Sequence, residues 1–422
     1  MFFFILLYLM LVLIRPQEYP AVEAMHLPLL PVTMACALLG WLLSPRKNFD
    51  APQYRLLPLF LLVMMFSVAV NGWMGGVLAQ LGGFAPALIL FVLLANACTT
   101  AARIRMVMIT IVICATVLAV HGMEQAKLGV GWTGVSLIED GRIQYVGIFN
   151  DPNDLGMLFV LTLPMAFYLS GGGGLAGLKR LFWLGCAGML LYGVYLTNSR
   201  GALLGVALVL GIYLWRRWGL VVAGLLGSIG LAGLLLLPSR LKDLSPEEAS
   251  ANGRVQAWYE GFQMFFSRPL FGVGAGNFTD HNELTAHNSY ILVLAETGFV
   301  GFTLWIAFVG YCLWMMTTIL RHRPELADAS AVSTWRREQV LATTMLLSLS
   351  GCLATAFFLS RSYAVVLYML AALVVGVYVH ARQQFPSLPR FSLERDVVRW
   401  PTLAGIALVV LYLVVKILLA FE

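Results

Sequence analysis

Long apolar runs recur along nearly the whole sequence and limit what this chain can fold into. Each run covers roughly 15 to 22 residues, and about 20 apolar residues are enough to cross a bilayer as a helix. The composition agrees, because 60% of the 422 residues are hydrophobic and only 11% are charged, against about 25% charged residues in soluble domains. The sequence therefore predicts an all-α polytopic membrane protein. Residues 1–14 have neither a basic start nor a small-residue cleavage site, so we interpret them as a first membrane helix.

We expect about twelve transmembrane helices from these runs. They lie near residues 1–14, 28–44, 56–71, 76–96, 104–121, 155–170, 180–197, 202–215, 219–237, 289–320, 339–359 and 363–380. A further run at 402–420 is a possible thirteenth helix, which either crosses the membrane or lies against the bundle. The six cysteines fall in or at the edges of apolar runs. We interpret them as small buried hydrophobic residues rather than as disulfides or metal ligands.

The distribution of lysine and arginine predicts an orientation for the bundle. Cytoplasmic loops of membrane proteins carry an excess of these residues. If the amino terminus is in the cytoplasm, most of the lysines and arginines lie on the cytoplasmic side. Every inside loop then carries more than one of them. The net charge of +6 then indicates orientation and contact with anionic lipid headgroups rather than with nucleic acid. Arginines in outer segments oppose this bias, which indicates that some of them have a function. Arg200 and Arg361 are the clearest cases, because each lies in a very short turn. The alternative for either residue is an interfacial arginine that snorkels to the membrane surface.

One long polar segment, residues 238–288, interrupts the apolar pattern. The chain thus divides into an amino-terminal transmembrane bundle (1–237), a large outer loop (238–288) and a carboxyl-terminal part with further helices and a cytoplasmic segment (289–422). Most of the candidate chemistry lies in this loop and at its end. We therefore expect the helices on either side to hold the loop over a pocket in the membrane.

Within the outer loop, residues 254–266 are predicted to form an amphipathic helix that lies on the membrane or caps the bundle. Its aromatic residues fall on or near one face at helical spacing: Trp258, Phe262, Phe265 and Phe266. A glycine-rich turn follows at 267–278. Its G-x-G-x-G pattern at 272–276 lacks the strand–helix unit of a dinucleotide site. We interpret the glycines as letting backbone pass close to a ligand or a helix end.

Two further outer turns carry polar residues. The turn N-D-P-N-D-L-G at 150–156 is typical of a helix start, and Arg142 lies just before it, where it could face a shared outer cavity. In LTNSRGALLG (196–205), Arg200 lies between two apolar runs, and Gly201 permits a tight reversal. The guanidinium of Arg200 presents a fork of donors suited to a diphosphate.

His287 stands just before Asn288, where the next membrane helix is expected to begin, so it is fixed at the outer membrane surface. A neutral imidazole there can accept a proton from a sugar hydroxyl, and a plain polar position at the rim is the alternative. Asp280 and His281, taken with His287, are only a weak signal for a metal site, and we expect none. Glu296 is two turns into the helix, where a buried carboxylate is costly. It is expected to orient His287 or to pair with an outer arginine, with a structural ion pair as the alternative.

Together these motifs resemble the O-antigen ligase (WaaL) family. That family lies within the superfamily that includes the O-antigen polymerases (Wzy) and the bacterial O-linking oligosaccharyltransferases. The most specific part is GRVQAWYEGFQMFFSRPLFGVGAGNF followed by AHNSYILVLAETG, and the N-D-P-N-D-L-G and S-R-G turns precede it in the same order as in the family. The resemblance implies a membrane-embedded glycosyltransferase of GT-C-like architecture with one large periplasmic loop.

Such enzymes take a glycan from undecaprenyl diphosphate, and ligases place it on lipid A–core to complete lipopolysaccharide. The resemblance implies an inverting, metal-independent reaction without a cofactor, in the bacterial inner membrane, with the active site facing the periplasm. It assigns His287 as the general base on the acceptor hydroxyl, and Arg200 and Arg254 as ligands of the diphosphate. Further residues are expected to contribute: Arg142 and Arg361 at the diphosphate, and Glu296, Asn288 and His281 in support. Fixed cations suit the negative charge that develops on the leaving group.

Two kinds of alternative function remain open at this point. Within the same superfamily, the acceptor is another O-antigen chain for a polymerase or a protein for an oligosaccharyltransferase. The absence of a large soluble domain after residue 380 disfavours the protein acceptor. Outside the superfamily, a transporter or flippase also has about twelve helices. Transporters bind substrate near the bilayer midplane, whereas the polar residues here gather on one side, which favours the enzyme.

Overall fold

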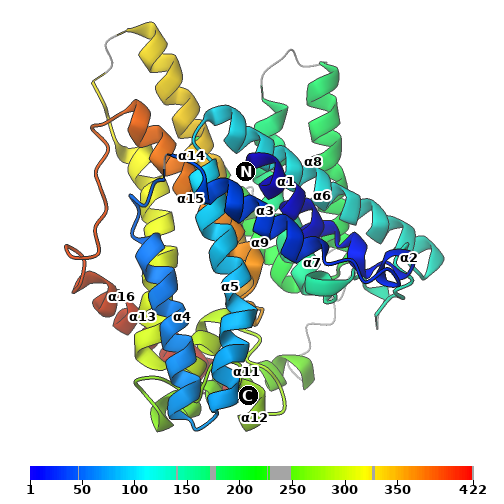
Figure 1. The fold of residues 1–422 in the computed structure, drawn as a ribbon, viewed down its shortest axis with the longest axis vertical. Coiled ribbons are helices and arrows are strands. Elements are labelled where there is room, and N and C mark those ends of the chain that lie inside the picture. The colour runs from blue at the N-terminus through cyan, green and yellow to red at the C-terminus, as the bar shows by residue number, and fades with distance from the viewer. Residues whose placement is uncertain are drawn as a thin grey trace.

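The computed structural model describes residues 1–422 except 46, 139–140, 172–176, 226, 229–248, 326–327 and 421–422. Across the described part the chain is helical, with two isolated β-bridges and no strand (Figure 1). The elements in order are α1 (Phe2–Ile14), η1 (Pro16–Glu18), α2 (Pro20–Glu23), α3 (Leu29–Leu42), α4 (Gln53–Val70), α5 (Met74–Ala97), α6 (Ala101–Leu128), η3 (Gly147–Phe149), α7 (Pro152–Ser170), α8 (Leu178–Leu196), α9 (Arg200–Trp218), α11 (Ala249–Ser267), α12 (Phe278–His281), α13 (Ser289–Arg321), α14 (Ala329–Ala356), α15 (Val365–Gln384) and α16 (Arg399–Ala420).

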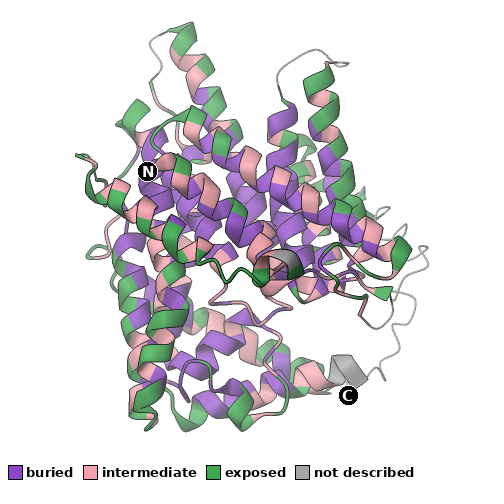
Figure 2. Cartoon of the chain, turned by 45° about the vertical axis from the view of Figure 1, so that its right-hand side comes forward, coloured by how far each residue is buried: buried purple, intermediate pink, exposed green. Residues whose placement is uncertain are grey.

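The protein is an all-α polytopic membrane protein, as the sequence predicted. Among the described residues, nine helices are long and apolar enough to span a membrane: α4, α5, α6, α7, α9, α13, α14, α15 and α16. The run at 402–420 lies within α16, which is one of the nine. Just over half of the helix expected at 219–237 lies outside the described residues. Buried side chains fill the interior of the bundle, and exposed ones lie on its outer surfaces (Figure 2).

The helix expected at 289–320 is broken, and this is the main correction to the sequence-based fold. Gly298 has φ 63° and ψ −165°, a conformation that essentially only glycine adopts. Beyond the break the two arms fold back on each other, because the rings of Tyr290 and Trp305 lie 5.2 Å apart. In a straight helix, fifteen residues would separate them by about 22 Å. The short arm of α13 therefore starts beside the first part of the long arm, near Trp305.

The glycine-rich turn after α11 holds this break in place. Its backbone N–H groups at Val273 and Gly274 donate to the carbonyl oxygens of Ala295 and Glu296, each at 3.0 Å. The N–H of Phe299, which opens the long arm, donates to the carbonyl of Pro269 at 2.8 Å. The turn thus supplies partners for backbone groups that the interrupted helix leaves without their usual ones. The glycines bring backbone close to a helix end, one of the two roles expected for them.

Side chains from α4 and α5 fix the outer side of the same turn. Asn71, just after α4, donates to the carbonyl of Gly272 at 3.0 Å, and Gln80 of α5 donates to the carbonyl of Ala275 at 2.7 Å. In Figure 1 these ends of α4 and α5 lie at the bottom, beside α11 and α12. We call this end of the bundle the site face, and the end marked by Gln53 and Arg321 the opposite face.

The amphipathic helix predicted in the outer loop is confirmed as α11. Trp258, Phe262 and Phe265 are buried, and Phe266 is 50% exposed. The helix packs against the short arm of α13 and against α16, where the rings of Phe262 and Tyr412 lie 5.3 Å apart. It therefore caps the bundle, which is one of the two positions expected for it.

Candidate active site

His287 is held in a fixed position at the start of α13. Its φ of 46° lies in the left-handed region, which few non-glycine residues adopt and which carries some strain. The next residue, Asn288, is buried and caps the helix, because its Oδ1 accepts from the N–H groups of Tyr290 and Ile291 at 2.9 and 3.2 Å. The cap and the strained backbone together set where the imidazole lies.

The surroundings of His287 favour the neutral imidazole. Burial lowers the pKa of His287 from its ordinary value, and the positive charges of Arg254 and Arg361 lower it further. The carboxylate of Asp151 acts in the opposite direction. Among the described residues, no hydrogen bond or ion pair occupies the ring of His287. A half-buried, neutral imidazole at neutral pH is the form that a general base requires.

Arg361 is anchored to the amino-terminal half of the chain. Its Nε lies 2.7 and 2.8 Å from the two carboxylate oxygens of Asp154, and its Nη2 lies 2.6 Å from Oδ2. The side chain of Asp154 is only 2% exposed, whereas that of Arg361 is 40% exposed. The backbone N–H of Arg361 also donates to Oγ of Ser289 at 3.0 Å. The ion pair thus connects the first turn of α7 to the loop between α14 and α15, close to the start of α13.

Arg142 joins the two turns that the sequence singled out. Its Nε donates to the carbonyl oxygen of Thr197 at 3.0 Å, and its Nη2 donates to Oδ1 of Asn153 at 3.1 Å. Asp151 caps α7, because its Oδ1 accepts from the N–H of Asn153 at 2.7 Å. The helix start predicted at 150–156 is therefore confirmed. Both Arg142 and Arg361 have protein partners where the sequence predicted a ligand.

The S-R-G turn begins α9 and lies against the loop that carries Arg361. Ser199 caps the helix by accepting from the N–H of Ala202 at 3.2 Å. Gly201 packs closely here, since a Cβ at this position would lie 3.0 Å from Cβ of Phe358. Arg200 is half-buried at this contact. The structure therefore brings the turn of Arg200 and the loop of Arg361 together, although they are far apart in the sequence.

Glu296 has different partners from those expected. Its Oε2 accepts from the hydroxyl of Tyr363 at 2.8 Å, and its Oε1 accepts from the N–H of Phe278 at 3.3 Å. Within the described residues, neither His287 nor any arginine is bonded to it, so the expected pairings are wrong. The reason is the break at Gly298, which places Glu296 against the glycine-rich turn.

The other candidate support, His281, is exposed at the end of α12. Nothing among the described residues joins His281 to His287. Throughout the described residues, no group of three or more histidine, cysteine, aspartate or glutamate side chains is placed to hold a metal ion. The candidate site therefore consists of His287 and four arginines: Arg142, Arg200, Arg254 and Arg361.

An apolar groove opens beside these residues, and the sequence did not locate it. Its volume is about 450 Å³, and α9, the two arms of α13 and α14 line it. Tyr290, close after His287, lies at one end together with Phe357 and Phe358. The groove runs from there along α9 past Leu208 and Ile212. Such a groove can take an apolar chain from the bilayer while its end stays near the polar groups.

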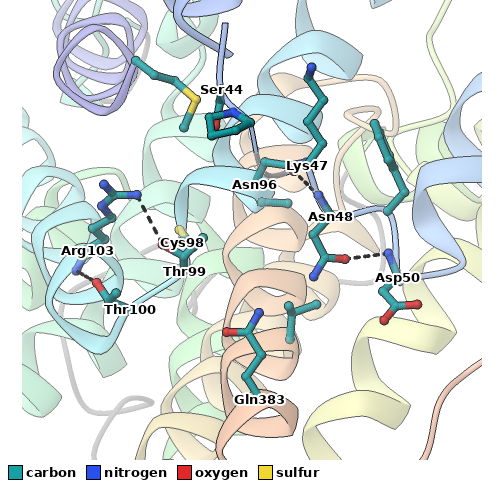
Figure 3. Close-up of a pocket in the computed structure, with 15 residues that line it drawn as sticks. Ser44, Lys47, Asn48, Asp50, Asn96, Cys98, Thr99, Thr100, Arg103 and Gln383 are labelled. Carbon is teal, nitrogen blue, oxygen red and sulfur yellow. Dashed lines mark hydrogen bonds between the residues drawn. The ribbon is translucent and has the colours of Figure 1, made fainter. Parts of the chain in front are cut away.

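A second cavity, of about 850 Å³, lies on the opposite face, between the α3–α4 connection, the α5–α6 turn and the end of α15 (Figure 3). Its polar groups largely bond to one another. The N–H of Asn48 donates to Oδ1 of Asn96 at 2.7 Å, and Arg103 donates to Oγ1 of Thr99 at 3.2 Å. Asp50 forms an ion pair with Arg382. We therefore interpret these contacts as holding the helix ends together.

Comparison with known protein families gives one match. Residues 185–306 match the family described as O-antigen ligase. The match supports the O-antigen ligase and polymerase superfamily. The matched segment of this superfamily contains Arg200, Arg254 and His287, whereas Arg142, Asp154 and Arg361 lie outside it. The superfamily consists of glycosyltransferase-like enzymes, so an enzymatic role is supported, and the match does not distinguish ligase from polymerase. No curated protein matches the chain.

Proposed function

We propose that the protein is an O-antigen ligase. It transfers a glycan from undecaprenyl diphosphate to lipid A–core in the bacterial inner membrane, with the site face toward the periplasm. One observation carries the proposal: the half-buried imidazole of His287, which bonds to none of the described residues, lies within the electrostatic influence of Arg254 and Arg361, beside the end of an apolar groove. A base, fixed cations and a groove for a lipid are the three parts that this reaction requires.

The groove between α9, α13 and α14 suits the polyprenyl chain of the donor. Its lining is apolar over the stretch from Phe358 to Leu208, so a hydrocarbon chain is transferred there from lipid without desolvating polar groups. Phe358 contacts Gly201 and precedes Arg361 closely in the chain. A diphosphate at this end of the groove comes within reach of Arg200 and Arg254, the two arginines that the family resemblance assigns to it.

The reaction then proceeds by direct displacement. His287 accepts the proton from the acceptor sugar hydroxyl as its oxygen attacks the anomeric carbon of the donor glycan. The bond between that carbon and the diphosphate oxygen breaks on the opposite face, so the configuration inverts. The negative charge that develops on the leaving diphosphate is stabilised by fixed cations, typically by a few kcal/mol for each donor.

Arg142 and Arg361 act in this proposal mainly as positioning residues. Arg142 bonds to Thr197 and Asn153, and Arg361 bonds to Asp154. The carboxylate of Asp154 neutralises much of the charge of Arg361, which weakens its contribution to a bound diphosphate. Their main effect is to fix the two outer turns next to the start of α13.

The first test is glycan transfer by the purified full chain carrying His287→Ala, supplied with undecaprenyl-diphosphate glycan and lipid A–core. We expect the unaltered protein to form ligated lipopolysaccharide and the variant to lose about 10²-fold or more of the rate, as removal of a general base does. His322→Ala is the matched control, since His322 lies on the opposite face and bonds to Ser387.

The outcomes separate the candidate functions. Equal transfer by His287→Ala and the unaltered protein would show that another group is the base. An unaltered protein that ignores lipid A–core but lengthens the donor glycan would be a polymerase. A protein that forms no product with donor and acceptor both on its site face would contradict the transferase proposal.

A further inference from the structure

Two neighbouring grooves on the opposite face are lined by basic side chains. The first basic groove lies between α9, α13 and α14, has a volume of about 530 Å³, and carries the cations Arg216, Arg217 and Arg336. The second basic groove lies between α6, α7, α8 and α14, has a volume of about 720 Å³, and carries Arg105, Lys179, Arg336 and Arg337. Both lie far from His287, at the other end of the bundle.

A ridge of α14 lies between the two grooves and contributes residues to both. Arg336 and Val340 line both of them. These residues are four positions apart on a helix, so their side chains lie on the same face, one above the other. Arg336 therefore stands between two cavities, with further cations on each side of it.

The grooves hold positive charge without compensating carboxylates. Of the described residues, no aspartate or glutamate lines either of them. Among the residues that the structure describes, none of the cations in the grooves forms an ion pair. The neighbouring carboxylate of Glu338 is 4% exposed and faces His380, with Oε1 and Nε2 3.5 Å apart. Within the described part of the chain, no carboxylate balances this excess of positive charge, so the grooves favour an anionic partner.

The walls of the grooves indicate where that partner comes from. Val340 is 54% exposed and Tyr213 is 48% exposed, which is typical of side chains that face lipid on a membrane protein. The cations lie near the ends of the helices, where lipid headgroups lie. Apolar walls below a cluster of arginines fit a phospholipid, with its acyl chains against the walls and its phosphate at the cations.

We propose that the two basic grooves together bind one anionic phospholipid with two phosphates, of the cardiolipin class. One phosphate enters each groove, and Arg336 contacts both from the ridge. A planar guanidinium binds phosphate oxygens through two parallel hydrogen bonds, so arginine at this position suits a shared contact. The proposal concerns the opposite face and is independent of the transfer reaction at His287.

The test is lipid retention by the full chain, extracted in mild detergent and examined by native mass spectrometry with added cardiolipin or phosphatidylglycerol. We expect cardiolipin to be retained at least tenfold better than phosphatidylglycerol. Arg336→Gln should lower cardiolipin retention about fivefold, the usual effect of one basic residue near a membrane surface. Arg336→Lys keeps the charge but not the fork of donors, so it should recover only part of the retention that Arg336→Gln loses.

Arg395→Gln is the matched control, because Arg395 is exposed in the loop that follows α15 on the same face but lines neither groove. Retention unchanged by Arg336→Gln, or lowered equally by Arg395→Gln, would overturn the proposed site. Equal retention of both lipids would refute the two-phosphate ligand. Displacement of bound cardiolipin by millimolar inorganic phosphate would show that the site takes soluble anions instead.

Discussion

The ion pair between Asp154 and Arg361 gives the sharpest test of how the candidate site is held together. The two side chains differ greatly in burial, with Asp154 at 2% and Arg361 at 40% exposure. The two ways of breaking the pair should therefore have unequal effects. Asp154→Asn leaves an arginine that can turn to water, whereas Arg361→Gln leaves a carboxylate that cannot.

The magnitudes follow from that difference. Asp154→Asn removes charge-assisted hydrogen bonds, and we expect it to lower the free energy of unfolding by about 1.5–3 kcal/mol. Arg361→Gln leaves an uncompensated buried charge, for which the loss is about 3–5 kcal/mol. In the double variant no charge is left unpaired. We expect it to recover a substantial part of what Arg361→Gln loses, with a coupling energy of up to about 3 kcal/mol.

The assay is unfolding of the purified variants in mixed micelles with increasing sodium dodecyl sulfate, followed by tryptophan fluorescence. The four proteins form a double-mutant cycle. The reasoning would be refuted if Arg361→Gln were no less stable than Asp154→Asn, or if the effects of the two single changes simply added. Glycan transfer by the same variants then shows whether losing the pair also displaces the base.

Three further changes test other parts of the structure. Asp151→Asn keeps the cap on α7 but removes the negative charge that raises the pKa of His287. The pKa of His287 should therefore fall, and the acidic limb of the kcat/KM profile should move to lower pH. A move to higher pH would contradict the assignment of His287 as the base. Gly298→Ala places a Cβ against the backbone of Leu270 at a positive φ, so we expect a loss of about 3 kcal/mol or more in the same unfolding assay, whereas Gly185→Ala, with open space around it, should cost nothing. Leu208→Trp narrows the apolar groove from an exposed position, so steady-state kinetics should show KM for the lipid-linked donor raised about tenfold with kcat little changed, and an unchanged KM would exclude the groove as the donor site.

The sequence predicted the class of fold and several local elements well. The repeated apolar runs predicted a helical membrane protein, and the aromatic spacing from Trp258 to Phe265 predicted α11. The turn at 150–156 was correctly predicted as a helix start. These predictions were correct because each depends on neighbours within a few residues, where periodicity and capping chemistry act directly.

The break in α13 was missed, although the sequence contains a signal for it. The helix has 33 residues, which would be about 50 Å if straight, far more than the roughly 30 Å of a bilayer core. A glycine nine residues from the start of so long a run marks the place where it can turn. The length of the run, rather than its hydropathy, carried this information.

The partners of the charged residues were beyond what local patterns can show. Asp154 and Arg361 are 207 positions apart in the chain, and Asp154 looked like part of a helix cap. Glu296 faces Tyr363 because of the same break in α13. Pairings of this kind depend on the packing of distant helices. Periodicity within one segment says which residues are polar, but it does not say which of them meet.

The folded-back short arm of α13 also sets the depth at which chemistry can occur. Tyr290 lies level with Trp305, which is six residues, or about 9 Å, along the long arm from its start at Phe299. His287 and the groove beside it are therefore recessed below the rim formed by the glycine-rich turn. In the proposed transfer, a donor whose diphosphate stays at the membrane surface would arrive by lateral diffusion alone. The proposed acceptor sugar, by contrast, would have to extend down past the rim, so its reach, as well as its stereochemistry, would decide which acceptors are used.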